Sequence, residues 1–224
     1  MSIGMAADRD ERSMPMSHTI PIVFVIDDDI SVRESLELLI QHEGWEPALF
    51  DSAHDFLARL PTVVPSCLIL DVNLPDLSGL DIQQRITDGK SSTPIIFITG
   101  YGDIPTSVRA MKAGAAEFLT KPLDDKVMID AIREAVRRGQ ENLAREEVQH
   151  QLQERFASLT KREREVMHLV VKGLMNKQVG FELDISEITV KAHRGRVMEK
   201  MQATTFVDLV NMAARLGIST AREA

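Results

Sequence analysis

The sequence contains a single cysteine and no long hydrophobic run, and these two absences exclude several classes of protein. With one cysteine, Cys67, no disulfide framework is possible, and its place inside an apolar segment predicts a buried thiol. No apolar run approaches the length of a membrane-spanning helix. Residues 1–19 carry charges where a signal peptide needs an apolar core. We therefore expect a disordered tail over residues 1–19 and a cytoplasmic protein that does not bind membranes.

The length and the uneven charge of the chain indicate two domains. The 224 residues, 44% of them hydrophobic, are enough to fill two ordinary cores. Residues 157–224 contain eleven basic and eight acidic side chains, a balance of +3, while residues 1–156 contain fifteen and twenty-six, a balance of −11. A basic C-terminal part suits contact with a polyanion, but ordinary variation in surface charge explains the balance equally well.

Short apolar runs alternate with amphipathic segments in the first half of the chain. The runs are Ile22–Ile26, Pro47–Phe50, Cys67–Leu70, Ile95–Thr99 and Ala116–Thr120. The segments with helical periodicity are Ser31–His42, Ser52–Arg59, Asp81–Thr87, Ile104–Ala113 and Asp124–Arg138. This alternation predicts a doubly wound α/β domain, in which helices cover both faces of a five-stranded parallel sheet.

Polar residues stand where four of these strands end. Asp27 and Asp28 follow the first strand, Asp71 the third, Thr99 ends the fourth, and Lys121 follows the fifth. The carboxyl ends of parallel strands meet at one edge of a sheet, where ligands bind. A phosphoryl-accepting site needs these residue types: a carboxylate nucleophile (Asp71), acids for a divalent cation, and hydroxyl and ammonium donors for phosphoryl oxygens. Mg²⁺ suits the site because it takes few carboxylates and bridges to phosphate oxygens.

The second half of the chain is predicted to be a small all-α domain. Thr160 and Glu163 have the spacing of a capping box and open a helix. Two further helices, Asn176–Leu183 and Glu187–Met201, are separated by a tight turn, and the second has cations on its surface. This pattern favours a helix-turn-helix, although a plain solvated helix explains the charges as well. Residues 139–156 are polar and nearly free of helix breakers, which predicts a semi-rigid helical linker.

Four segments of the first half resemble the signature segments of the response-regulator receiver domain, which has the flavodoxin-like fold. They are VFVIDDDISVRESL, LILDVNLPDLSGLD, PIIFITGYGD and AMKAGAAEFLTKP, and the resemblance covers residues 20–138. It implies that Asp71 accepts a phosphoryl group from a sensor histidine kinase. It also implies that Asp28, Asp71 and the backbone carbonyl of Asn73 bind Mg²⁺, with Asp27 acting indirectly on the metal.

The same resemblance implies how the site acts on the rest of the domain. Thr99 and Lys121 would bind the phosphoryl oxygens, and the Lys121–Pro122 bond would be cis. Thr99 and Phe118 would form a switch pair that acts on the face built by Ile104–Ala113, the fifth strand and Asp124–Arg138, and this face would dimerise. Tyr101 would narrow the approach of a hydrolytic water, or is simply a half-exposed loop aromatic.

The segment LTKREREVMHLVVKGLMNKQVGFELDISEITVKAHRGRVMEKM resembles the LuxR/NarL-type four-helix DNA-binding domain, expected over residues 157–224. Glu187–Met201 would be the recognition helix in the major groove. The expected DNA-contacting residues are Lys177, Thr189, Lys191, Arg194, Arg196 and Lys200. Lys191 would read base edges and the other cations would contact phosphates. Gly180 stands where alanine is usual, at a cost of about 1 kcal/mol in helix propensity, and Gly195 removes a side chain from the recognition helix.

With the receiver, this domain resembles the FixJ class of transcriptional regulators. The resemblance implies a phosphorylation-switched transcriptional activator, not an enzyme. Its expected partners are a sensor histidine kinase, promoter DNA, RNA polymerase and, after phosphorylation, a second copy of the chain. A phosphohydrolase of the haloacid-dehalogenase type uses similar chemistry but needs an acid two residues past the nucleophile, where Asn73 stands. A phosphate relay that acts only by docking is disfavoured by the helix-turn-helix.

Overall fold

A computed structural model describes residues 19–58, 64, 66–89, 92–100 and 102–218. Apart from Thr19, the predicted disordered tail lies outside the described residues, and so does Tyr101. The chain divides into two compact units, Met1–Gln140 and Glu141–Ala224, and the division falls within one helix. Among the described residues, no helix is both long and apolar enough to cross a membrane.

The first unit is built on one parallel sheet. Its strands are β1 (Ile22–Ile26), β2 (Glu46–Phe50), β3 (Ser66–Asp71), β4 (Ile95–Thr99) and β5 (Glu117–Thr120), in the spatial order β2-β1-β3-β4-β5. In the register, Ile26 pairs with Leu70, and Thr99 pairs with Thr120. The residues that follow β1 and end β3 therefore lie at the same edge of the sheet.

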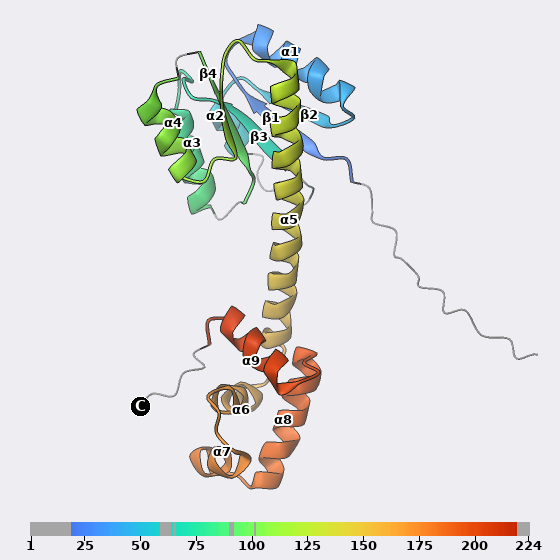
Figure 1. The fold of residues 1–224 in the computed structure, drawn as a ribbon. Coiled ribbons are helices and arrows are strands. Elements are labelled where there is room, and N and C mark those ends of the chain that lie inside the picture. Colours follow the sequence, from blue (N-terminus) through green and yellow to red (C-terminus); the bar gives the residue numbers. More distant parts are fainter. Residues whose placement is uncertain (1–18, 59–63, 65, 90–91, 101, 219–224) are drawn as a thin grey trace, which may run out of the picture. The chain divides into compact units, whose positions relative to one another are not determined.

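Helices cover both faces of this sheet, which confirms the predicted fold class (Figure 1). They are α1 (Ile30–His42), α2 (Ala53–Leu57), α3 (Gly79–Asp88), α4 (Ile104–Lys112) and the first part of α5 (Asp125–Ala157). Side chains alternate between faces along a strand. Phe24 and Ile26 of β1 pack with α2, α3 and α4, whereas Val23 and Val25 pack with α1 and α5. The sequence predicts a helix over Asp124–Arg138 followed by a helical linker over residues 139–156, and in the structure one helix, α5, runs through both to Ala157.

The second unit is all helical, as predicted. After the C-terminal part of α5 it contains α6 (Lys161–Val171), α7 (Asn176–Leu183), α8 (Glu187–Met201) and α9 (Phe206–Arg215). Its core joins Val166 and Val170 of α6 to Val190 and Val197 of α8 and to Leu209 of α9. The predicted capping box is confirmed: the Thr160 N–H donates to Glu163 Oε2 at 2.8 Å, and the Glu163 N–H donates to Thr160 Oγ1 at 3.3 Å.

Candidate functional site

The structure brings Asp27, Asp71 and Lys121 together at the carboxyl edge of the sheet. The Lys121 ammonium lies 2.7 Å from Asp27 Oδ2 and 3.2 Å from Asp71 Oδ2. Asp27 is completely buried, Asp71 is 6% exposed, and Asp28 is exposed at the rim. One carboxylate oxygen from each of the three aspartates lies within 4.8 Å of the others. Residues after β1, at the end of β3 and after β5 therefore form one acidic pocket, in which the Lys121 ammonium contacts two of the carboxylates.

The charges in this pocket are incompletely balanced. Burial raises the pKa of Asp27, and the negative charge of Asp71 adds to that effect, while hydrogen bonds from Lys121 and the Asp29 amide oppose it. Burial alone would lower the pKa of Lys121, but its hydrogen bonds and ion pairs with Asp27 and Asp71 outweigh burial and raise it. The ammonium thus occupies a place where positive charge is favoured. Oxygen donors of this kind, short of positive charge, fit Mg²⁺.

The loop after β3 is held in place by its backbone. The Asn73 N–H donates to Asp71 Oδ1 at 3.3 Å, and the Gly79 N–H donates to the Val72 carbonyl at 3.0 Å. A Cβ atom on Gly79 would lie 3.1 Å from the Phe97 ring and 2.6 Å from the Asp71 carbonyl oxygen, and the second distance is closer than Cβ atoms come to backbone. Only glycine lets α3 start this close to Asp71. The sequence reasoning missed this residue, and the glycine in LPDLSGL was the available signal.

Arg33 is a second residue that the sequence reasoning missed. Its guanidinium, in the first turns of α1, donates to the Asp27 carbonyl at 2.6 Å. This contact holds the backbone that carries the acidic pair against the start of α1. The available signal was its position: Arg33 lies six residues after Asp27, in the first turns of the helix that follows the first strand, where a long side chain can reach the acidic residues.

The two proposed switch residues lie beside this pocket. Thr99 is completely buried, and its Oγ1 accepts from Asn73 Nδ2 at 3.4 Å. The Lys121 N–H donates to the Thr99 carbonyl at 2.7 Å, and the Lys121–Pro122 bond is cis, as the resemblance implies. Phe118 is half-buried, with its ring centroid 6.2 Å from that of Phe97. Thr99 therefore lies between the pocket and the end of β5, the strand that carries Phe118.

In the second unit, α7 and α8 are joined by a tight turn. Asp184 takes the left-handed backbone conformation with φ of 52°, and the Ile185 N–H donates to the Gly180 carbonyl at 3.0 Å. Ser186 caps α8 by accepting from the Thr189 N–H at 3.1 Å, and the two hydroxyls lie 2.8 Å apart. The pair of helices has the arrangement of a helix-turn-helix.

The expected DNA-contacting cations fall into two groups. Lys177 and Arg196 are exposed, and Lys191 is 63% exposed beside Glu187 at 3.3 Å. The other two make contacts within the unit. The Arg194 guanidinium donates to Asn176 Oδ1 at 3.2 Å and lies 4.9 Å from the centre of the Phe206 ring.

Lys200 is the clearest departure from the expected outward-facing cations. Its ammonium lies 2.7 Å from Glu163 Oε2 and 3.2 Å from the Ser158 carbonyl. Glu163 is buried, so this contact turns Lys200 toward the N-terminus of α6. Arg194 and Lys200 are half-buried at the border of the packed face of α8, and not fully on its surface as predicted, because each bridges α8 to another part of the unit.

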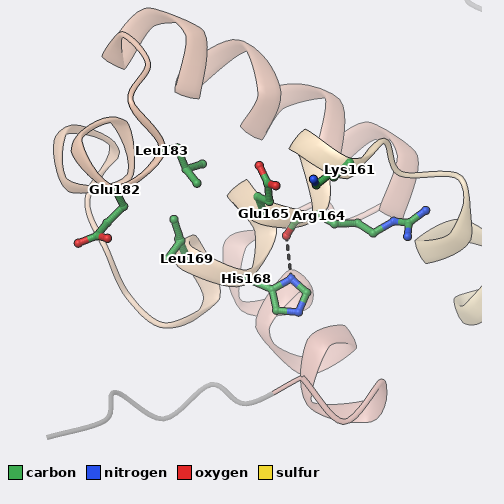
Figure 2. Close-up of a pocket in the computed structure, with 7 residues that line it drawn as sticks. All are labelled: Lys161, Arg164, Glu165, His168, Leu169, Glu182 and Leu183. Atoms are coloured by element: carbon green, nitrogen blue, oxygen red, sulfur yellow. Dashed lines mark hydrogen bonds between the residues drawn. The ribbon is translucent and has the colours of Figure 1, made fainter.

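A hollow of about 430 Å³ lies between α6 and α7. Figure 2 draws the residues that line it. Lys161, Arg164 and His168 line one part of it, and Leu169 and Leu183 another. His168 Nδ1 lies 2.8 Å from the Arg164 carbonyl, and the Arg164 guanidinium donates to the carbonyls of Leu159 and Ala157. The Arg164 guanidinium thus joins α6 to the end of α5 and to the turn after it, whereas the His168 contact lies within α6. We therefore attribute the hollow to packing within the unit.

Comparison with known proteins gives matches to both units. Residues 23–133 match the family model of the response regulator receiver domain, and residues 157–213 match that of the bacterial regulatory proteins of the luxR family. Nodulation protein W of Bradyrhizobium diazoefficiens is 49% identical over 201 residues, which cover 90% of this chain and 88% of that protein. Transcriptional regulatory protein FixJ of the same organism is 40% identical, covering 88% and 96%. The solved structure of response regulator StyR has a TM-score of 0.75 and 44% identity, covering 88% of this chain and 100% of that one.

Proposed function

The chain belongs to the FixJ/NarL family of response regulators, transcription regulators of two-component systems, and we propose that Asp71 is the residue that its sensor histidine kinase phosphorylates. The observation that carries this proposal is the 3.2 Å contact of the Lys121 ammonium with Asp71 inside a pocket of three aspartates. Lys121 already lies where a donor to phosphoryl oxygens is needed. Asp71 is only 6% exposed, so a phosphoryl donor must reach its carboxylate through the small part of it that is open to solvent.

Phosphoryl transfer is proposed to proceed by attack of an Asp71 carboxylate oxygen on the phosphorus of a phosphohistidine. The new P–O bond forms as the P–N bond breaks, and the departing imidazole keeps the electron pair and takes a proton from water. Lys121 donates to the oxygens of the moving group and Thr99 donates after its hydroxyl turns from Asn73. Asp28, Asp71 and the Asn73 carbonyl would hold Mg²⁺, with Asp27 beside them. When bound, this ion neutralises charge that builds up on the phosphoryl oxygens.

The proposed output of phosphorylation is a dimer. Movement of Thr99 changes the packing of Phe118 against Phe97 and thereby the surface formed by α4, β5 and α5. That surface is apolar on α4: Ile104 is 79% exposed, Val108 43% and Met111 44%. Exposed apolar side chains grouped on one helix favour association with another molecule, which here is a second copy of the chain.

The dimer is proposed to bind promoter DNA through α8 of each copy. Two related helices about one DNA turn apart require a target with two-fold symmetry. Lys191 is proposed to read base edges, Lys177 and Arg196 to contact phosphates, and Thr189 to contact DNA at the start of the helix. Arg194 and Lys200 are assigned instead to holding α8 in place. Activation of transcription through RNA polymerase follows as part of the same proposal.

The test is phosphorylation of the full chain by acetyl phosphate in the presence of Mg²⁺. Asp71→Asn should take up no phosphoryl group by mass spectrometry, because an amide is not a nucleophile. Asp81→Asn is the matched control, since Asp81 is an exposed acid in the first turn of α3, and it should be labelled like the unsubstituted protein. Equal labelling of Asp71→Asn would place the acceptor elsewhere.

A further inference from the structure

The centre of the exposed face of α8 is apolar. Ile188 is 79% exposed, and Ala192 and Gly195 are exposed as well. Spacings of four and three residues place these three on one line along the helix, and we call them the α8 strip. The opposite side of α8 is packed, with Val190 and Val197 completely buried. The strip therefore points directly away from the core of its own domain.

Cations lie on both sides of the α8 strip. At 3.6 residues per turn, Lys191 lies about 60° to one side of the Ile188 line and Arg196 about 80° to the other. Both are exposed. From position 188 to position 195, the strip itself contains no charged or hydrogen-bonding side chain. An uncharged apolar line between two cations is therefore built into the surface of this helix.

This arrangement matches the major groove of DNA. Phosphates border the groove on both sides and attract cations, whereas the groove floor presents base edges. Among those edges, the 5-methyl group of thymine is the apolar feature. A Cβ atom on Gly195 would meet nothing within 4 Å, so the space above this part of the helix is open to an approaching surface.

We propose that Ile188 and Ala192 contact thymine methyl groups, so that the protein prefers sites with thymine opposite the N-terminal half of α8. This inference rests on the proposed function, in which α8 enters the major groove. It adds an apolar component of sequence selection to the polar component supplied by Lys191. The charge pattern favours DNA over an apolar protein partner, because phosphates on both sides of the groove complement the exposed Lys191 and Arg196, whereas such a partner would offer them no negative charge.

The experiment uses duplexes that the full-length, phosphorylated protein selects from a random pool. Each thymine of a selected duplex is then replaced by deoxyuridine, which removes only the methyl group. Binding is measured by fluorescence anisotropy at one fixed salt concentration. At one or more thymines of each half-site, the dissociation constant should rise about three- to fivefold, the effect of one buried methyl-sized group.

Ile188→Ala removes the contact in both copies of the dimer and should therefore weaken binding to the unmodified duplex by about the square of that factor, about nine- to twenty-five-fold. It should also become insensitive to deoxyuridine at the position that Ile188 contacts, whereas Ile188→Val should keep part of the sensitivity. Val207→Ala is the matched control, because Val207 is a β-branched residue at the second position of α9 and is 64% exposed. This control should bind and discriminate like the unsubstituted protein.

The outcomes separate this inference from the proposed function. If Lys191→Ala weakens binding while neither deoxyuridine nor Ile188→Ala has an effect, α8 reads DNA but the methyl contact is refuted. If Ile188→Ala changes dimer formation and leaves sequence preference intact, the strip is a protein contact and the inference is also refuted. If the phosphorylated protein selects no duplex, or no substitution on α8 alters binding, the proposed function fails together with it.

Discussion

Replacement of Lys200 by methionine tests whether this cation holds the DNA-binding domain together or contacts phosphates. In the structure its ammonium is 2.7 Å from the buried carboxylate of Glu163, which also accepts from the Thr160 N–H. The hydrogen bond from Lys200 is the main cause that lowers the pKa of Glu163 to about 2, and the Thr160 amide adds to it. Lys200→Met leaves this carboxylate buried with one donor fewer.

The expected cost follows from that pKa. Lowering it from its ordinary value of 4.5 to about 2 corresponds to about 3 kcal/mol of interaction with the charged form. Thr160 supplies part of this, and the Lys200 side chain is 35% exposed, so solvent screens another part. Loss of the ammonium should then destabilise the domain by about 2 kcal/mol, the size of a charge-assisted hydrogen bond. Amide hydrogen exchange of α6 and α8 in the full chain should become about thirtyfold faster.

The pH dependence has a definite sign. Because the pKa of Glu163 is lower in the folded domain than in the unfolded chain, its stabilising contribution is fully present above pH 4.5 and is lost as the pH falls toward about 2. The difference in stability between the unsubstituted protein and Lys200→Met should therefore shrink over this interval. Glu163→Gln, which keeps a capping oxygen but no charge, should flatten the same dependence.

Salt dependence of DNA binding separates the two roles of Lys200. A phosphate contact contributes about 0.9 to the slope of log K against log salt concentration. Lys200→Met should leave this slope unchanged, whereas Lys177→Ala, at an exposed position on α7, should reduce its magnitude by about 1.8, because the dimer loses one contact in each copy, without changing hydrogen exchange. Unchanged exchange together with a reduced slope in Lys200→Met would refute the structural role.

Three further predictions concern the receiver domain. Asp28→Asn should reduce the rise in thermal midpoint caused by Mg²⁺, whereas Asp29→Asn should not, because Asp29 caps α1 and asparagine caps equally well. Gly79→Ala should destabilise the domain by about 1–3 kcal/mol in urea unfolding, since its Cβ would overlap backbone, while Gly100→Ala has open space and should have little effect. Cys67 is completely buried and its pKa is raised to about 12, so thiol labelling should occur only as fast as the domain opens.

Much of the receiver could be predicted because its pattern is local and its topology is restricted. Apolar runs of strand length separated by helical segments leave few arrangements other than a parallel sheet. In such a sheet the residues after β1 and at the end of β3 must meet, and the register that pairs Ile26 with Leu70 places Asp27 beside Asp71. The proximity of the aspartates therefore follows from strand order and strand ends alone.

The directions of individual side chains were not predictable in the same way. Helical periodicity leaves Lys200 near the border between the packed and exposed faces of α8, and its partner, Glu163, lies thirty-seven residues earlier in the chain. Places where two backbone segments come close together are equally hard to predict from the sequence. A Cβ atom on Gly180 would lie 2.7 Å from the Ile185 carbonyl oxygen, because α7 comes close to the turn that follows it. An alanine at this position would gain helix propensity but would overlap that oxygen.

The energy available to the proposed switch is small, because its groups already have partners. Changing a population from 1:99 to 99:1 requires about 5.5 kcal/mol. Charge-assisted hydrogen bonds from Lys121 and Thr99 to a phosphoryl group would contribute about 1.5–3 kcal/mol each. This gain is reduced because Thr99 loses its 3.4 Å hydrogen bond with Asn73 and the ion pair of Lys121 with Asp27 is weakened. The two bonds together supply about 3–6 kcal/mol before these losses, so neither donor alone reaches the demand and the proposed switch needs both. The fold places Lys121 against Asp71 and links it to Thr99 through the Thr99 carbonyl and the Lys121 amide.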